Sequence, residues 1–117
     1  MEEYFKFRAF DTLNSVMELN VHELDALTEI LHKDRYKVMQ FTGIYDKNKK
    51  ELYKGDIFSH NLINWVVVFS GKQGVMLARK IERNTTWKSL MDINNISKYI
   101  EIIGNIYENP ELINGAS

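Results

Sequence analysis

Four side chains that could bind a metal ion are spaced as on one face of a helix. They are His22, Asp25, Glu29 and His32. Residues three, four or seven apart share a helix face, and imidazole with carboxylate suits a divalent transition metal. Glu-x-x-His metal sites in helix bundles use facing helices, and this sequence has no second such motif. We therefore interpret the four residues as a solvated helix face, with a metal site as the alternative.

A second candidate site is a lysine-rich segment that also contains tyrosines. Its residues are Tyr45, Lys47, Lys49, Lys50, Tyr53 and Lys54. Lysines can contact phosphates, and tyrosines can stack on the bases of single-stranded nucleic acid. However, Asp46, Glu51 and Asp56 dilute the positive charge, and lysines at a hairpin tip also discourage edge-to-edge pairing of strands. Nucleic-acid contact is therefore the alternative interpretation, and a soluble hairpin tip is the favoured one.

The sequence contains little other evidence for a catalytic site. The chain has no cysteine, which excludes a thiol nucleophile, a disulfide framework and a cysteine zinc site. Ser59 and His60 are adjacent, so on a strand their side chains point to opposite faces. Gly71–Gly74 is predicted to be a second hairpin turn, and it lacks the Lys-Ser/Thr of a phosphate-binding loop. We expect no catalytic residues, no cofactor and no enzymatic activity.

Length and charge point to a small cytoplasmic protein. The 117 residues (13.8 kDa) predict a single domain spanning residues 1–117. The net charge of −1 gives little attraction to nucleic acid or to a membrane surface. The longest apolar run, Trp65–Phe69, is too short to cross a bilayer. The first residues lack the pattern of a signal peptide, and the absence of cysteine is compatible with a reducing compartment.

The central segment Val38–Ile57 predicts a β-hairpin. Two apolar-rich runs flank a polar tip, Asp46–Lys50. Asn48 is the tip residue that we expect at positive φ. Gly43 and Gly55 bracket the hairpin, and we expect the chain to bulge or change direction at both. A new strand should start after Gly55.

Hydrophobic periodicity predicts the remaining elements. We expect strands at Tyr4–Phe10, Val16–Val21, Trp65–Phe69, Val75–Ala78 and Tyr99–Tyr107, helices at Asn20–Lys33 and Trp87–Ile96, and a terminal helical turn after Asn109-Pro110. The first two strands should pair, and Met17, Leu19 and Val21 should share a face. Asn20 and Glu23 form a capping pair for the first helix. Trp65 and Trp87 are expected in the core or at an interface.

Three blocks of this sequence resemble the YopX family of phage and prophage proteins. They are Lys6–Asp11, Val38–Ile57 and Ile100–Leu112, in the family order. Lys49 stands where the family usually has Gly, Phe10 where it has Trp, and Ile102 where it has Val. The resemblance implies a phage or prophage origin, the bacterial host cytoplasm and a non-catalytic accessory role. We interpret the residues that match the family as those that form backbone bends and apolar contacts.

Together these patterns predict a mainly β protein: a small bent antiparallel sheet or SH3-like barrel, with a short N-terminal helix and a C-terminal helical turn. The predicted function is a protein-interaction module that acts on a host protein, a phage protein or a second copy of itself. Many aromatics and short edge strands favour a homo-oligomer. The alternative is a nucleic-acid-binding accessory protein that uses the lysine-rich tip.

Overall fold

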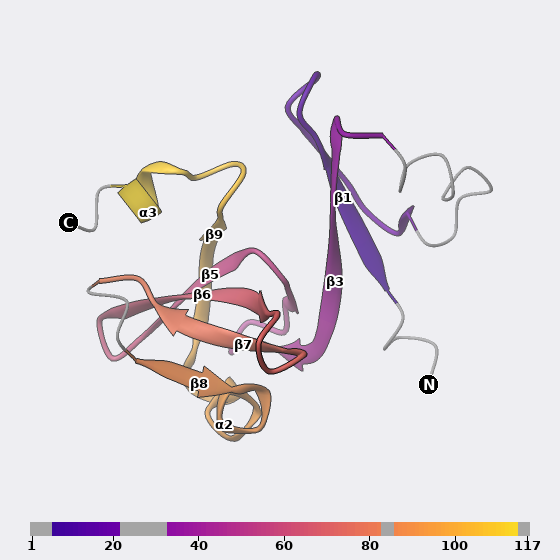
Figure 1. Ribbon diagram of the computed structural model, residues 1–117. Helices are drawn as coiled ribbons and strands as arrows, with labels where there is room; N and C mark the ends of the chain where they lie inside the picture. The colour runs from indigo at the N-terminus through magenta and orange to yellow at the C-terminus, as the bar shows by residue number, and fades with distance from the viewer. Residues whose placement is uncertain (1–5, 22–32, 83–85, 115–117) are drawn as a thin grey trace. The chain divides into compact units, whose positions relative to one another are not determined.

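The protein consists mainly of antiparallel strands. Its structure is a computed structural model that describes residues 6–21, 33–82 and 86–114. The strands are β1 (Phe7–Asp11), β2 (Val16–Glu18), β3 (Tyr36–Tyr45), β4 (Glu51–Tyr53), β5 (Asp56–His60), β6 (Ile63–Ser70), β7 (Val75–Lys80), β8 (Trp87–Ser89) and β9 (Glu101–Asn105). The helices are α2 (Leu90–Asn95), the 3-10 helix η3 (Ser97–Tyr99) and α3 (Glu111–Asn114). The prediction of a mainly β protein is confirmed (Figure 1).

The chain divides into two compact units, Met1–Phe41 and Thr42–Ser117. In the described residues, one sheet has the strand order β2-β1-β3-β4 and the other β8-β7-β6-β5-β9. The long strand β3 passes from the first unit into the second. Its first half pairs with β1, from Asp11↔Tyr36 to Phe7↔Gln40.

The first unit is a small sheet with a small core. β1 and β2 pair as predicted, through Asp11↔Val16. Ala9 and Val21 are fully buried, and apolar side chains of β1 and β3 pack against them. The second strand is shorter than predicted, because the chain leaves the extended conformation at Asn20 (φ 55°). Leu19, predicted to share a face with Met17 and Val21, is exposed, whereas Val21 is fully buried. The predicted helix Asn20–Lys33 falls almost entirely on residues 22–32, outside the described residues.

The central hairpin forms as predicted, with a correction at its tip. Gly43 (φ 88°) and Gly55 (φ 92°) are both left-handed, and β5 starts directly after Gly55. The tip residue at positive φ is Lys49 (φ 66°), so the expectation for Asn48 was wrong. The Asp46 carboxylate accepts the backbone N–H of Asn48 at 2.8 Å, which holds that residue in an Asx-type turn. The left-handed bend therefore falls one residue later.

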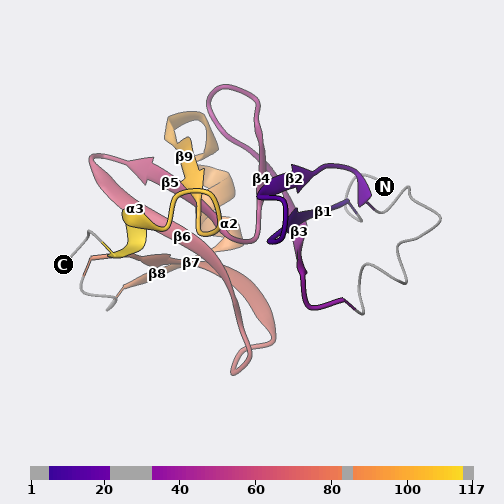
Figure 2. The ribbon, with the colours of Figure 1, turned by 90° about the horizontal axis from the view of Figure 1, so that it is seen from above.

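The second sheet is a series of hairpins. Asn61 (φ 52°) and Leu62 (φ 68°) make a two-residue connection between β5 and β6, as in a type I′ turn. The predicted hairpin at 71–74 is confirmed by the Ser70↔Val75 pair. Figure 2 shows this β6–β7 hairpin reaching beyond the neighbouring strands of its sheet. The final strand β9 returns beside β5, antiparallel to it.

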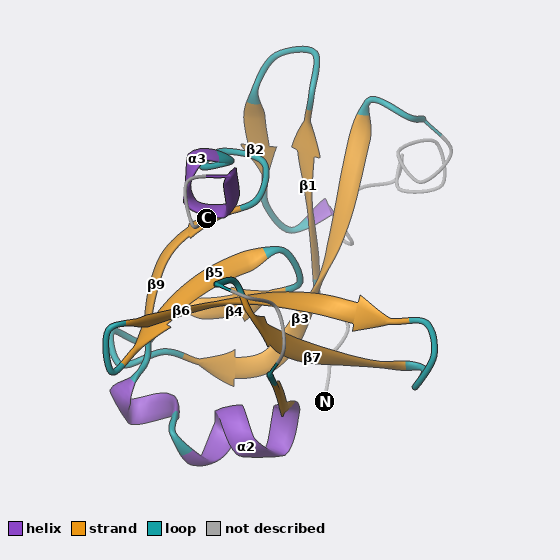
Figure 3. Ribbon diagram, turned by 60° about the vertical axis from the view of Figure 1, so that its left-hand side comes forward, coloured by secondary structure: helices purple, strands orange, loops and turns teal. Residues whose placement is uncertain are grey.

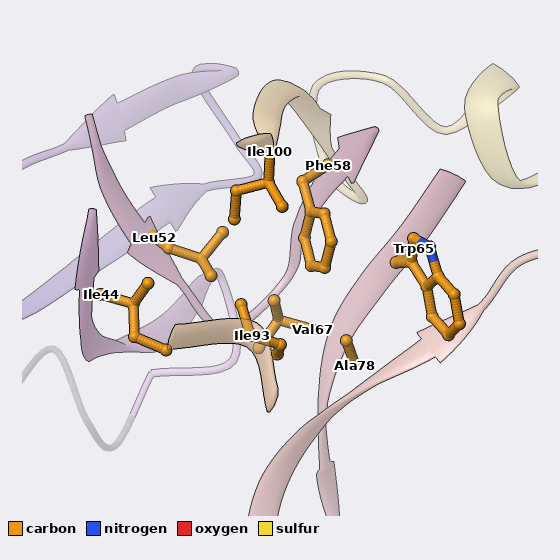
Figure 4. Close-up of a cluster of buried hydrophobic side chains, with 8 residues drawn as sticks. All are labelled: Ile44, Leu52, Phe58, Trp65, Val67, Ala78, Ile93 and Ile100. Atoms are coloured by element: carbon orange, nitrogen blue, oxygen red, sulfur yellow. The ribbon is translucent and has the colours of Figure 1, made fainter. Parts of the chain in front are cut away.

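In the strands of the second unit, every second side chain points to the same face of the sheet, and the apolar ones form the core. Phe58, Trp65, Val67 and Ala78 are buried together from three neighbouring strands. Eight residues form this cluster: Ile44, Leu52, Phe58, Trp65, Val67, Ala78, Ile93 and Ile100 (Figure 4). Helix α2 lies against one side of the sheet (Figure 3), and its Ile93 is fully buried in the cluster. The sheet therefore curls around α2 and the β3–β4 hairpin.

Two predicted elements near the C-terminus have different boundaries in the structure. Residues 87–96 do not form one helix: Trp87–Ser89 pairs with β7 as β8, and α2 begins where the Ser89 hydroxyl accepts the Asp92 N–H at 3.1 Å. The strand predicted at residues 99–107 is shorter, because residues 97–99 form η3. Phe69, the last residue of the predicted strand Trp65–Phe69, lies within β6 and is 53% exposed. The terminal helical turn is confirmed, with Leu112 N–H donating to the Asn109 carbonyl.

Candidate functional site

The lysine-rich tip is fastened to β9 by a buried carboxylate. Asp46 is 4% exposed and accepts three backbone N–H groups: Asn48 at 2.8 Å, Lys50 at 2.9 Å and Ile102 at 2.9 Å. The Lys47 N–H also donates to the Ile100 carbonyl at 3.0 Å. These bonds occupy part of the outer edge of β9, where open backbone groups would otherwise invite another strand. The tip therefore protects an edge of the second sheet.

The six candidate nucleic-acid residues differ in exposure. Lys49 and Lys50 are exposed, and Tyr45 is 43% exposed. Lys47 is also exposed, but its Nζ lies 3.5 Å from a carboxylate oxygen of Glu101. Tyr53 is buried, and its hydroxyl donates to Glu51 at 2.9 Å, so its ring cannot stack on a base in this arrangement. Lys54 is partly buried. The structure thus leaves Tyr45 as the one accessible aromatic of the six.

The other chemistry considered in the sequence is not assembled in the described residues. His22, Asp25, Glu29 and His32 lie outside them. Within the described ranges, no group of three His, Cys, Asp or Glu side chains is close enough to hold a metal ion. Ser59 and His60 are consecutive residues of β5, which directs their side chains to opposite faces.

An ion pair with two hydrogen bonds joins Arg35 and Asp11 in the first unit. Arg35 donates to both carboxylate oxygens of Asp11, at 3.1 and 2.7 Å. Asp11 also accepts the N–H groups of Leu13 and Asn14 in the β1–β2 turn. The Arg35 guanidinium is the largest cause that lowers the pKa of Asp11, to about 2. Because every donor is used to shape a turn, this pair is structural.

An apolar hollow lies along β7, β8 and the start of α2. This β7–β8 groove has a volume of about 290 Å³. It is lined by the apolar side chains Val75, Met76, Leu77, Trp87 and Leu90, together with Gln73 and Ser89. Val75 is 50% exposed and Trp87 52% exposed. Large apolar side chains gathered at a surface hollow are typical of a binding site.

Register explains how the groove arises. Ala78 points into the core, so its neighbours Leu77 and Arg79 point to the opposite face of the sheet. Their partners on β8 are Ser89 and Trp87, which must share that face. Sequence reasoning assigned Trp87 to the core or an interface, and the structure places it at the surface. It missed the groove because only this pairing brings Trp87 to the same face of the sheet as Val75 and Leu77.

Comparison with known proteins identifies the family of this chain. A family model described as YopX protein matches residues 6–114. The chain belongs to the YopX family. The resemblance carried by the three sequence blocks is confirmed. None of the curated proteins matches this YopX family member.

A solved structure is similar to this YopX chain in fold. The crystal structure of protein EF1440 from Enterococcus faecalis has 22% sequence identity and a TM-score of 0.60. The match covers 92% of this chain and 96% of that chain. At this identity the similarity shows a common fold over nearly the whole of both chains.

The YopX-like letters have structural tasks in this chain. Besides Asp46, the buried Asp56 accepts the Tyr53 N–H at 2.7 Å across the β4–β5 turn. Asn105 accepts the N–H groups of Tyr107 and Glu108, and so forms the bend after β9. Each polar side chain satisfies buried backbone groups of a turn. Within the described residues, no helix has the length and apolar character needed to cross a membrane.

Proposed function

We propose that this YopX family member is a non-catalytic protein-interaction module, and that the β7–β8 groove is its contact surface. The observation that carries the proposal is the half-exposed pair Val75 and Trp87 at the groove. Phe69 and Met91, 53% and 75% exposed, lie on β6 and α2 beside lining residues. Burying these side chains against a partner would stabilise a complex by about 25 cal/mol for each Å² of apolar surface.

The family supports a phage or prophage origin and an accessory role in the bacterial cytoplasm, with a host or phage protein as partner. The second unit also supports the SH3-like part of the predicted class. Its five strands run in the order β8-β7-β6-β5-β9, with short helices before the last strand, as in small SH3-like barrels. Folds of this kind serve many unrelated functions, so the groove and not the fold carries the proposal.

An affinity capture with a matched control tests the proposed function. The full chain is immobilised and exposed to a bacterial host lysate, with and without phage proteins. A double variant, Val75→Ser with Trp87→Ser, removes the apolar groove, while Tyr99→Ser removes a 70% exposed side chain outside it. We expect proteins captured by the wild type and by Tyr99→Ser to be lost with the double variant. Equal capture by all three proteins would refute the groove as the contact surface.

Nucleic-acid binding by the hairpin tip is the second candidate function. The observation in its favour is the exposure of Lys49 and Lys50 beside Tyr45. It predicts salt-dependent binding of a labelled oligothymidylate, lost when Lys47, Lys49 and Lys50 are replaced by Glu. Binding that persists in this triple variant, or no binding at low salt, would refute it.

Self-association is the third arrangement, in which the partner is a second copy of the chain. Light scattering on the purified wild type and the groove double variant tests it. A homo-oligomer that dissociates in the double variant supports the groove as a contact between copies, and a monomer at all concentrations contradicts it.

A further inference from the structure

The backbone of β8 has hydrogen-bonding groups that point away from its sheet. The Lys80 N–H donates to the Thr86 carbonyl at 2.9 Å, which makes these two residues a hydrogen-bonded pair. In an antiparallel ladder, bonded and non-bonded pairs alternate. The next pair, Arg79↔Trp87, is therefore non-bonded, and the N–H and C=O of Trp87 point outward. The same alternation directs the Ser89 N–H outward, through Leu77↔Ser89.

This outward side is the end of the sheet. β8 is the last strand in the order β8-β7-β6-β5-β9 of the described residues. At the other end, the Asp46 carboxylate accepts the Ile102 N–H of β9, and the Lys47 N–H donates to the carbonyl of Ile100, the residue just before β9. One edge is thus occupied by the chain's own hairpin tip, while the β8 edge presents the Trp87 groups next to an apolar groove. Edge strands with unpaired groups are templates for an added strand.

The groove beside this edge fits side chains of a peptide. Its volume of about 290 Å³ lies at the lower end of the range for small-molecule sites. Its lining is mostly apolar, with Gln73 and Ser89 as the polar members. An added strand directs every second side chain to the same face, so it could place apolar residues in the groove while its backbone bonds to Trp87.

Charge around the groove indicates the character of the added strand. Residues 71–80 and 86–89 contain four cations and no acid, although the whole chain has a net charge of −1. The four are Lys72, Arg79, Lys80 and Lys88. Arg79 shares the face of Leu77 and Trp87, whereas Lys80 and Lys88 share the face of Ala78, with the Lys88 Nζ 4.7 Å from the centre of the Trp65 ring. Lys72 lies in the turn at the start of the groove, and Arg79 is the strand partner of Trp87. A partner segment with acidic residues on both sides of its apolar residues would complement this charge.

We propose that β8 binds an extended, acid-flanked apolar segment of another protein by strand addition. This inference rests on the proposed interaction function and specifies its partner and geometry. A second copy fits less well, because antiparallel pairing of two β8 strands about Lys88 would place two lysines opposite each other. Single-stranded nucleic acid would use the cations and the Trp87 ring but would leave the outward N–H and C=O without a strand partner.

The matched variants Trp87→Pro and Trp87→Val separate the backbone from the side chain. Both remove the indole, but only Pro removes the outward N–H. That N–H makes no bond to β7, so Pro is tolerated at this edge position. Circular dichroism and thermal unfolding of both variants verify that each is folded. If Trp87→Pro does not fold, hydrogen exchange of the Trp87 and Ser89 amides in the wild type serves as the test.

The probe is a short capped peptide with Val and Leu two positions apart and acidic residues at both ends. A second peptide has lysines in place of the acids, and an oligothymidylate is the nucleic-acid arm. We expect the acidic peptide to slow exchange of the Trp87 and Ser89 amides by about tenfold and to bind about tenfold more tightly than the lysine peptide. We expect Trp87→Val to retain binding and Trp87→Pro to lose it.

The outcomes distinguish this inference from the proposed function. Equal binding of the acidic peptide to Trp87→Pro and Trp87→Val, without amide protection, would overturn strand addition. Tighter binding of oligothymidylate than of either peptide would also overturn it. If lysate proteins are lost with the groove double variant but are captured equally by the Pro and Val variants, strand addition fails while the interaction function stands. If nothing is captured by the wild type, the interaction function fails as well.

Discussion

Replacing Asp46 should destabilise the protein more than its surface position suggests. The residue belongs to a hairpin tip whose lysines are exposed, yet its carboxylate is buried and accepts three backbone N–H groups. Two of the donors, Asn48 and Lys50, shape the tip itself. The third, Ile102, is 56 residues away and joins the tip to β9. Asp46→Ala removes all three acceptor contacts at once.

The loss of stability expected for Asp46→Ala depends on how exposed the three N–H donors are. A hydrogen bond to a charged group contributes about 1.5–3 kcal/mol, and a buried donor left without a partner costs a similar amount. Asn48 and Lys50 are exposed, so water replaces part of the loss there, whereas Ile102 is half-buried. We expect Asp46→Ala to lower the free energy of unfolding by about 3 kcal/mol. Asp46→Asn keeps one acceptor oxygen, but its NH2 group would face the Ile102 N–H, so that two donors oppose each other. We therefore expect Asp46→Asn to lower the free energy of unfolding by about 1–2 kcal/mol.

Urea unfolding followed by tryptophan fluorescence measures these differences. Lys49→Gly is the matched control at the same tip, because Lys49 has φ 66° and is the position where the YopX wording usually has Gly. A side chain in this conformation costs about 1–2 kcal/mol, and the greater freedom of unfolded Gly offsets much of the gain. We expect Lys49→Gly to be neutral or slightly stabilising. The reasoning is refuted if Asp46→Ala is as stable as the wild type, or if Lys49→Gly is as damaging as Asp46→Ala.

Three further predictions concern other parts of the chain. Asp11 has a folded pKa of about 2 against an ordinary 3.8, so its stabilising effect is complete above pH 4 and is lost as the pH falls toward 2. The difference in urea midpoint between the wild type and Asp11→Asn should therefore shrink between pH 4 and pH 2. A difference that stays constant over this interval would contradict the prediction. Gly104→Ala would place a methyl group 2.5 Å from the Asn109 side chain and should cost about 1–3 kcal/mol, whereas Gly71→Ala, with no atom within 4 Å, should be neutral in the same urea titration. Ile93→Ala should lower the free energy of unfolding by about 2–5 kcal/mol because the side chain is fully buried. Met91→Ala in the same helix should change the thermal midpoint little. Similar losses of stability for the two variants would show that α2 does not cover the core.

Local patterns predicted the hairpins well and the tertiary contacts poorly. Gly43, Gly55 and the polar segments at 46–50 and 71–74 specify bends within a few residues, so they could be located from the sequence. The bond from Asp46 to Ile102 joins residues far apart in the chain, and no local pattern contains it. Trp87 was assigned to a helix because Leu90, Ile93 and Ile96 repeat every three residues. Pairing with β7 decided otherwise, since strand formation depends on the neighbouring strand more than on intrinsic preference.

The candidate site could not be predicted for the same reason. None of its residues suggests a site by itself, and the groove exists because the register of β7 and β8 brings Val75, Leu77 and Trp87 to one face of the sheet. The lysine-rich tip, in contrast, stands out in the sequence, and its neighbouring acid turned out to hold backbone groups. Composition therefore drew attention to a segment whose main visible task is structural.

The scaffold and the groove of this chain are formed by different residues. The blocks at 6–11, 38–57 and 100–112, which carry the YopX wording, supply the turns, the buried carboxylates and much of the core. The groove is formed by residues 73–90, which lie between the second and third blocks. A scaffold held by one set of residues and a surface supplied by another allows the surface to change without loss of the fold. In this chain, substitutions along β7 and β8 should therefore change the groove while the turns and the buried carboxylates keep the fold.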